Sequence, residues 1–95
     1  MRITGSQKLQ IKKVIADTFG DASEVWLFGS RADDNKRGGD LDLYVEPISN
    51  DWFDAKIQAI QQLESILPYP VDIAVKEQDK NIAIYKVAKT QGLKL

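Results

Sequence analysis

The chain has 95 residues, of which 43% are hydrophobic and 28% are charged; this composition is typical of a globular domain and excludes a disordered chain. The length predicts a single domain over residues 1–95 with a modest core. The formal net charge is −1 and the basic residues are scattered, which disfavours direct binding of duplex DNA. The sequence contains no Cys and no His, which excludes disulfides, thiol catalysis and zinc sites built from these residues.

Nothing in the sequence indicates export or insertion into a membrane. The first ten residues, MRITGSQKLQ, lack the apolar run of a signal peptide, and no stretch approaches the length that a bilayer span requires. We therefore expect a cytoplasmic protein that has no membrane partner.

The first two expected elements are a helix and a strand. Apolar residues recur at spacings of three and four from Ser6 to Phe19, which predicts a helix with one buried face, Ser6 as its N-cap and Gly20 as its stop. Residues 24–28 (EVWLF) form a short run of β-branched, aromatic and aliphatic side chains, typical of a central strand buried on both faces. Trp26, within this run, is expected in the core.

A polar turn and a second strand follow. Residues 31–39 (RADDNKRGG) are rich in turn formers, and the next segment alternates between apolar and polar side chains. Because successive side chains of a strand point to opposite faces, Asp40, Asp42 and Tyr44 share one face. Tyr44 therefore either lines a site formed with these carboxylates or packs against a helix.

The second half of the chain predicts helix, strand and helix. The first of these helices runs from Ser49 or Asn50, as its cap, to Leu67, and its buried stripe is expected to comprise Phe53, Ile57, Ile60 and Leu63. Residues 71–75 (VDIAV) predict a third strand, with Asp72 on the face opposite its aliphatic residues. A weaker helix is predicted over residues 79–91, with Gly92 as its stop and with a solvated face that carries Lys80, Lys86 and Lys89.

The order of these elements predicts the class of fold. The first two strands are joined by a short connection and are expected to be antiparallel, whereas the third follows a helix long enough for a crossover. The predicted fold is therefore α+β, with a small mixed sheet of about three or four strands flanked by helices.

Three aspartates are candidate metal ligands and catalytic residues. Asp40, Asp42 and Asp72 converge if their two strands are neighbours. Clustered carboxylates raise one another's pKa, and a divalent cation relieves this cost. Mg²⁺ prefers oxygen ligands and completes its coordination with water and substrate phosphates, so the cluster predicts a magnesium site, with two ions for an in-line displacement.

A glycine and a serine at the end of the first strand are candidates for binding phosphate. Gly29 lets the backbone approach a phosphate closely, and backbone N–H groups beyond it, together with the Ser30 hydroxyl, can donate to the phosphate oxygens. Arg31 and Arg37 are either charge partners of the same nucleotide or ordinary surface arginines of a polar turn.

The segment LFGSRADDNKRGGDLDLYV resembles the signature of the DNA polymerase β-like nucleotidyltransferase superfamily, and the short chain resembles its minimal nucleotidyltransferases (MNT), which include the antitoxins of HEPN/MNT toxin–antitoxin pairs. The resemblance implies a nucleotidyltransferase fold in which Asp40 and Asp42 hold the Mg²⁺ ions, with Mn²⁺ as an alternative. It also implies that Asp72 completes the metal site and helps to activate the acceptor hydroxyl, and that Gly29 and Ser30 hold the triphosphate.

The resemblance implies that the protein transfers AMP from a nucleoside triphosphate, ATP, to a tyrosine hydroxyl of a partner HEPN toxin and releases pyrophosphate. It also implies that the protein forms a homo- or hetero-oligomer. Two positions depart from the pattern: Asp33 stands where many relatives carry arginine, and Gly39 where they carry serine. These departures favour an alternative, an inactive antitoxin that masks its toxin. A further alternative is a catalytic subunit that modifies a small molecule or an RNA end.

Overall fold

The computed structural model describes residues 3–29, 39–49, 51–77 and 80–95. Its elements in chain order are α1 (Gly5–Phe19), β1 (Glu24–Phe28), β2 (Leu41–Glu46), α2 (Phe53–Ile66), β3 (Val71–Val75), α3 (Ala83–Gln91) and β4 (Leu93–Lys94). The candidate site residues Ser30, Arg31 and Arg37, and Asp33, lie outside the described residues.

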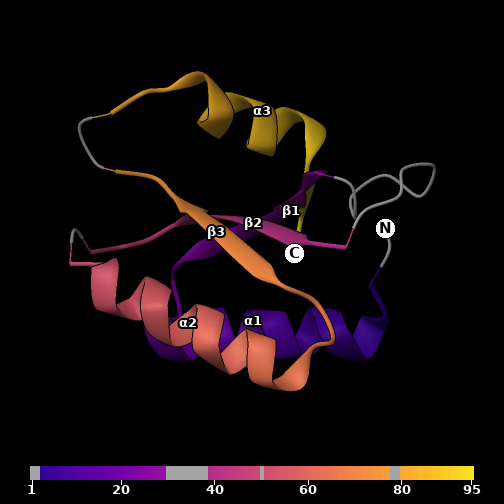
Figure 1. Ribbon diagram of the computed structural model, residues 1–95. Coiled ribbons are helices and arrows are strands. Elements are labelled where there is room, and N and C mark those ends of the chain that lie inside the picture. Colours follow the sequence, from indigo (N-terminus) through magenta and orange to yellow (C-terminus); the bar gives the residue numbers. More distant parts are fainter. Residues whose placement is uncertain (1–2, 30–38, 50, 78–79) are drawn as a thin grey trace.

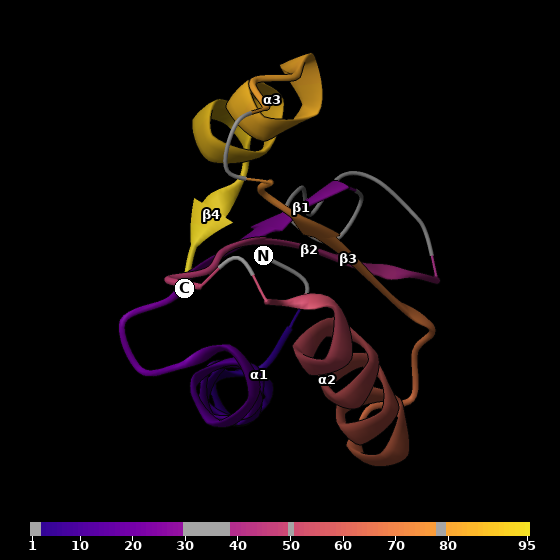
Figure 2. The ribbon, with the colours of Figure 1, turned by 90° about the vertical axis from the view of Figure 1, so that its left-hand side faces the viewer.

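The four strands form one mixed sheet in the order β3-β2-β1-β4. Strand β1 is antiparallel to β2 and to β4, and β2 is parallel to β3. Helices α1 and α2 cover one face of the sheet and α3 covers the other (Figures 1 and 2). The predicted α+β class and mixed sheet are confirmed, and the edge strand β4 is an addition, since a two-residue strand is too short for a periodic pattern.

The predicted cap of the first helix was wrong by two residues. Helix α1 is capped by Thr4, whose Oγ1 accepts a hydrogen bond of 3.0 Å from the Gln7 backbone N–H, while the Gln7 side chain accepts one of 3.0 Å from the Thr4 N–H. Thr4 and Gln7 form a capping box, and its T-x-x-Q spacing is visible in the sequence. Ser6 therefore lies within the first turn.

The other two helices begin later than predicted. Helix α2 has Trp52 at its N-cap without a capping side chain, and Ser49 instead accepts a hydrogen bond of 3.2 Å from the Asp51 N–H, forming a local turn of a kind common for serine. Asn50 lies outside the described residues. Helix α3 begins at Ala83 and ends at Gln91, with Gly92 at its C-cap, as predicted.

The main core lies between the sheet and the layer of α1 and α2. Leu27, Leu43 and Ile73 are neighbours across β1, β2 and β3 and are almost fully buried. They pack in one cluster with the buried apolar residues of α1 and α2. The aliphatic face predicted for β2 is therefore the core face, which leaves its polar face on the side of α3.

The predicted buried stripe of α2 was partly wrong. Leu63 is buried and Ile60 is partly buried against the main core, but Phe53 and Ile57 are 63% and 42% exposed. The buried stripe instead follows Ala55, Ala59 and Leu63 at intervals of four residues, with Ala59 fully buried and Ala55 partly so. Small side chains on this stripe allow a close approach to the neighbouring elements, which a prediction based on large apolar residues does not capture.

A second, smaller cluster packs α3 onto the sheet. Trp26, Tyr44, Tyr85 and Ala88 are its buried members, and the ring centroids of Tyr44 lie 5.4 Å from Trp26 and 5.5 Å from Tyr85, within the range of favourable aromatic pairs. The prediction that Trp26 is core is confirmed. Of the two roles considered for Tyr44, packing against a helix is the one observed.

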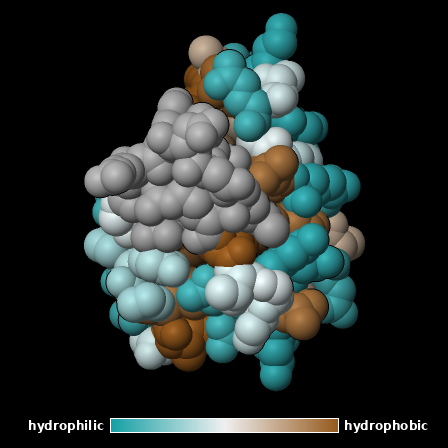
Figure 3. All heavy atoms as spheres, turned by 90° about the vertical axis from the view of Figure 1, so that its right-hand side faces the viewer, coloured by the Kyte–Doolittle hydropathy of each residue, from teal (hydrophilic) through white to brown (hydrophobic). Residues whose placement is uncertain are grey.

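The surface carries exposed apolar side chains on several elements, among them Leu9, Phe53 and Val87. On the face shown in Figure 3, hydrophobic residues outside the grey atoms occur in separate small areas among hydrophilic ones. None of the helices in the described part of the chain has both the length and the apolarity required to cross a bilayer.

Candidate functional site

The two strands that carry the candidate aspartates are neighbours. Strands β2 and β3 are parallel, and their register places Asp42 directly opposite Asp72. The backbone N–H of Leu41 donates a 2.8 Å hydrogen bond to the Pro70 carbonyl, which joins the starting points of the two strands. Asp40 immediately precedes β2. The topology therefore brings the three aspartates to one end of the sheet, as the sequence predicts.

Asp42 experiences the charges of both other aspartates. Its side chain is partly buried, whereas Asp40 and Asp72 are exposed. Burial, then the negative charge of Asp72, and then that of Asp40, raise the pKa of the Asp42 carboxyl above its ordinary value. The three side chains thus create a shared negative potential at this end of the sheet.

This potential and its oxygen donors fit a divalent cation. Carboxylate oxygens are the ligands that Mg²⁺ prefers, and a cation would relieve the repulsion that Asp42 experiences. Among the described side chains, no group of three His, Cys, Asp or Glu residues is placed to hold one ion together. The roles of Asp40, Asp42 and Asp72 as metal ligands remain predictions.

Gly29 directly follows β1 and lies beside this cluster. Its φ of +74° lies in the left-handed region, where a side chain is strained. Phe28 pairs with Asp42 across β1 and β2, and a Cβ atom at Gly29 would collide with Oδ2 of Asp42. Both constraints require glycine here. Its close approach to Asp42 is observed, while binding of a triphosphate by Gly29, Ser30, Arg31 and Arg37 remains a prediction.

We expect Gly29→Ala to destabilise the protein by at least 1–2 kcal/mol, the approximate cost of a left-handed conformation for a residue with a Cβ atom. The new methyl group also displaces the Asp42 carboxylate, so activity that depends on Asp42 should fall. Urea unfolding measures the first effect. The matched control is Gly5→Ala, because a Cβ atom at Gly5 meets nothing within 4 Å; equal losses in both variants would contradict this role of Gly29.

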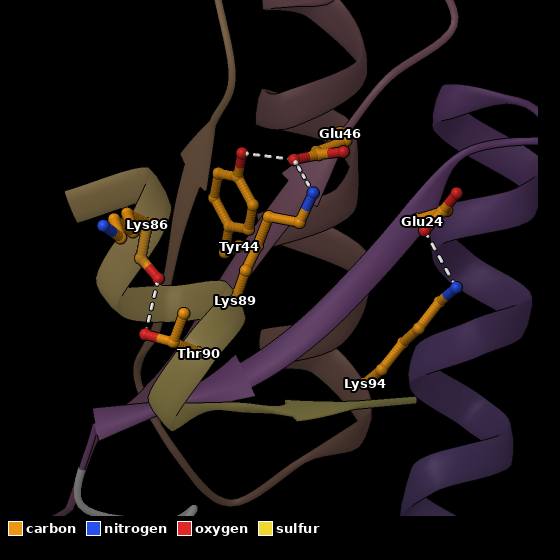
Figure 4. Close-up of polar contacts among 7 residues, drawn as sticks. All are labelled: Glu24, Tyr44, Glu46, Lys86, Lys89, Thr90 and Lys94. Atoms are coloured by element: carbon orange, nitrogen blue, oxygen red, sulfur yellow. Dashed lines mark hydrogen bonds and ion pairs between the residues drawn. The ribbon is translucent and has the colours of Figure 1, made fainter. Parts of the chain in front are cut away.

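A polar network, not anticipated from the sequence, lies further along the same face of β2 (Figure 4). The Tyr44 hydroxyl donates a 2.7 Å hydrogen bond to Oε2 of Glu46, and the Lys89 ammonium lies 3.2 Å from the same oxygen. Lys89 is exposed, as predicted, yet it also lies 5.2 Å from the centre of the Trp26 ring. The i, i+2 spacing of Tyr44 and Glu46 could have predicted the contact between them, because residues two apart in a strand share one face.

The network determines the ionisation of its members. Burial alone would raise the pKa of Glu46, but the hydrogen bonds from Tyr44 and Lys89, together with the charges of Lys89 and Lys76, outweigh burial and lower it. Burial, followed by the hydrogen bond to Glu46 and its negative charge, raises the pKa of the Tyr44 phenol well above its ordinary value. At neutral pH the network therefore contains a glutamate anion, a neutral tyrosine and a lysine cation.

The lowered pKa of Glu46 predicts a pH-dependent contribution to stability. An acid whose pKa is lower in the folded than in the unfolded state stabilises the fold above its unfolded pKa, and this stabilisation is lost as the pH falls through the folded pKa. We therefore expect Glu46→Gln to reduce the free energy of unfolding at pH 7, by an amount that shrinks as the pH falls through the folded pKa of Glu46. Urea unfolding at several pH values measures this difference.

The matched control for Glu46→Gln is Glu24→Gln. Glu24 pairs with Lys94 at 2.9 Å, and both side chains are about half exposed (Figure 4). Such surface pairs contribute little to stability, so Glu24→Gln should shift the curve by less than Glu46→Gln. An equal or larger shift for Glu24→Gln would show that the Glu46 network has no special role.

The chain resembles known proteins both in sequence and in fold. Residues 9–93 match the family model described as Polymerase beta, Nucleotidyltransferase. No curated protein sequence matches the chain significantly.

Several solved structures share the fold. A chain of the MntA–HepT toxin–antitoxin complex is 21% identical with a TM-score of 0.70, over 96% of this chain and 70% of that chain. A double Asp-to-Glu mutant of that system is 20% identical with a TM-score of 0.73, over 92% and 70% of the two chains. A complex of tri-AMPylated Shewanella oneidensis HEPN toxin with MNT antitoxin gives 22% identity and a TM-score of 0.69, over 94% and 68%.

Proposed function

Because the chain belongs to the polymerase beta nucleotidyltransferase family, we propose that it is an MNT-type antitoxin that transfers AMP from ATP to a hydroxyl of a HEPN toxin. The observation that carries this proposal is the placement of Asp42 opposite Asp72, with Gly29 against Asp42. A related fold occurs in the complex of a tri-AMPylated HEPN toxin with an MNT antitoxin, which supports both the transferred group and the class of partner.

In this proposal the two halves of the site have different tasks. Gly29 and Ser30 hold the triphosphate, with Arg31 and Arg37 as its charge partners. Asp40, Asp42 and Asp72 hold two Mg²⁺ ions, or Mn²⁺, which when bound supply positive charge to the phosphates and to the attacking oxygen. The shared negative potential at Asp42 is the property of the chain that draws cations to this place.

The proposed reaction is an in-line displacement at the α-phosphorus of ATP. The acceptor hydroxyl oxygen forms a new bond to that phosphorus, and the bond from the phosphorus to the oxygen that bridges it to the β-phosphate breaks. Pyrophosphate leaves with that oxygen. The hydroxyl proton passes to the Asp72 carboxylate, which is exposed and therefore accessible to an acceptor that approaches from outside.

The acceptor in this proposal belongs to a partner protein, in a hetero-oligomer in the cytoplasm. Asp40 and Asp72 lie exposed at one end of a small sheet, so the described residues offer an open site rather than an enclosing one. A macromolecular acceptor, such as a tyrosine on the surface of the toxin, can reach such a site directly.

Incubation with the cognate HEPN toxin, ATP and Mg²⁺ tests the proposal. Intact-mass spectrometry should show the toxin gaining the mass of one or more AMP groups, and a chelator should prevent this gain. A toxin that is neutralised without any gain in mass would contradict the proposal and would support the masking antitoxin, which the departures at Asp33 and Gly39 motivate.

A further inference from the structure

A cavity of about 330 Å³ opens beside α3, near the end of β2 and the segment that follows β3. The residues that line it include Tyr44, Glu46, Lys76, Tyr85 and Lys86. The volume lies at the lower end of the range of small-molecule sites.

The cavity is separate from the aspartate cluster. The antiparallel register pairs Phe28 with Asp42 at one end of β1 and β2, and Glu24 with Glu46 at the other. Asp42 and Glu46 are four positions apart in an extended strand, which separates them by about 13 Å. Between these two ends, α3 packs onto Tyr44 through Tyr85 and Ala88. The cavity therefore opens at the end of the sheet opposite to Gly29.

The cavity carries an excess of positive charge. Three of its lining residues are lysines and one is a glutamate, which gives a formal charge of +2 at neutral pH (three minus one). Lys89 lies 3.2 Å from Glu46, so these two charges offset each other. The charge of Lys76 also acts on Glu46, and no ion pair within 4.0 Å is found for Lys86 among the described residues. The lining as a whole therefore keeps a positive charge that can attract an anion.

The hydroxyl groups of the two lining tyrosines already form hydrogen bonds within the protein. Tyr44 donates to Glu46, while Tyr85 donates to the Val75 carbonyl at 3.3 Å and accepts from the Glu77 N–H at 3.2 Å. A ligand would therefore be recognised by the lysine ammonium groups and by the side-chain amide of Asn81, which also lines the cavity. Ammonium and amide N–H groups are donors suited to an anion.

We propose that this cavity is a second ligand site, independent of nucleotidyl transfer, and that it binds a small compound with a dianionic phosphate group. A phosphate monoester carries a charge of about −1.5 to −2 at pH 7. This one group therefore matches the formal charge of +2 of the cavity lining. One carboxylate supplies only half of that charge. Lysine is an established phosphate binder that acts as a point charge.

NMR titration of the intact chain, without Mg²⁺ or ATP, tests this site with glycerol 3-phosphate, inorganic phosphate and glycerol. Both phosphates should shift the amide signals of Asn81 and Tyr85 in a saturable way, and the tighter of the two identifies the source of the phosphate group. Lys76→Gln with Lys86→Gln should weaken binding at least tenfold. The matched control, Lys12→Gln with Lys13→Gln, removes two exposed charges from α1 and should leave binding unchanged.

Three results would overturn the proposal: equal binding of glycerol, equal weakening by the two lysine pairs, or shifts centred on Gly29 and Asp42 instead of Asn81. The outcome is separable from that of the proposed enzymatic function. Phosphate binding should persist in Asp40→Asn with Asp42→Asn whether or not the wild-type protein transfers AMP.

Discussion

Replacing Asp40 and Asp42 together by asparagine is expected to reduce nucleotidyl transfer by about 10³-fold or more, because the ligand oxygens lose the negative charge that holds the ions. Metal ions supply several kcal/mol of transition-state stabilisation, and each 1.36 kcal/mol corresponds to a tenfold change in rate. Incorporation of label from ATP into the partner measures this effect. Transfer that persists at the wild-type rate would refute the proposed mechanism.

The same double variant should be more stable than the wild-type protein in the absence of Mg²⁺. The pKa of Asp42 is raised in the fold, so its ionised form destabilises the folded state at pH 7, and this cost disappears as the pH falls below the ordinary pKa of an aspartate. Asparagine removes the cost at every pH. Urea unfolding at pH 7 should therefore give a higher free energy of unfolding for the variant.

The matched control for both effects is Asp17→Asn with Asp21→Asn. These aspartates are exposed, one in α1 and one two residues beyond its end, and their replacement removes the same formal charge. Transfer should be unchanged, and stability should vary by no more than about 0.5 kcal/mol, as is usual for surface substitutions. An equal gain in stability would point to net charge, rather than the Asp42 cluster, as its cause.

The largest expected effect on stability is that of Leu43→Ala, a loss of about 2–5 kcal/mol in the free energy of unfolding. Leu43 is fully buried in β2 and lies between Leu27 and Ile73 on the neighbouring strands. Its truncation leaves a cavity at the centre of the sheet. Because a domain of this size is only marginally stable, the variant should show a clearly lowered unfolding midpoint in urea.

Leu9→Ala is the matched control for Leu43→Ala. It removes the same atoms from a side chain that is 69% exposed, so its effect should stay within about 0.5 kcal/mol. If the two substitutions had similar effects, the assignment of the main core to the layer between the sheet and α1 and α2 would be wrong.

The parts of the fold that the sequence could predict are those set by local patterns. The alternation of Leu41, Asp42, Leu43 and Tyr44 determines which residues share a face, whatever the rest of the chain does. To predict that Asp72 lies opposite Asp42, one further inference was needed: the crossover through α2 makes β2 and β3 parallel neighbours. The convergence of these aspartates was predictable because both steps rest on general rules of strand geometry.

The parts that could not be predicted depend on contacts between distant segments. Strand β4 exists through its pairing with β1, and its two residues carry no signal of their own. The stripe of α2 passes through Ala55 and Ala59 because of what the helix packs against, not because of its own hydrophobicity. The cavity beside α3 likewise combines Tyr44 with residues from Lys76 to Thr90 that no local pattern connects.

Labelling ATP at two different positions tests the central claim most directly. The protein, its cognate HEPN toxin and Mg²⁺ are incubated either with ATP labelled at the α-phosphate or with ATP labelled at the γ-phosphate. Transfer of AMP predicts that the α-label becomes attached to the toxin and that the γ-label is released in pyrophosphate. Attachment of the γ-label, or neutralisation of the toxin with neither label attached, would contradict it.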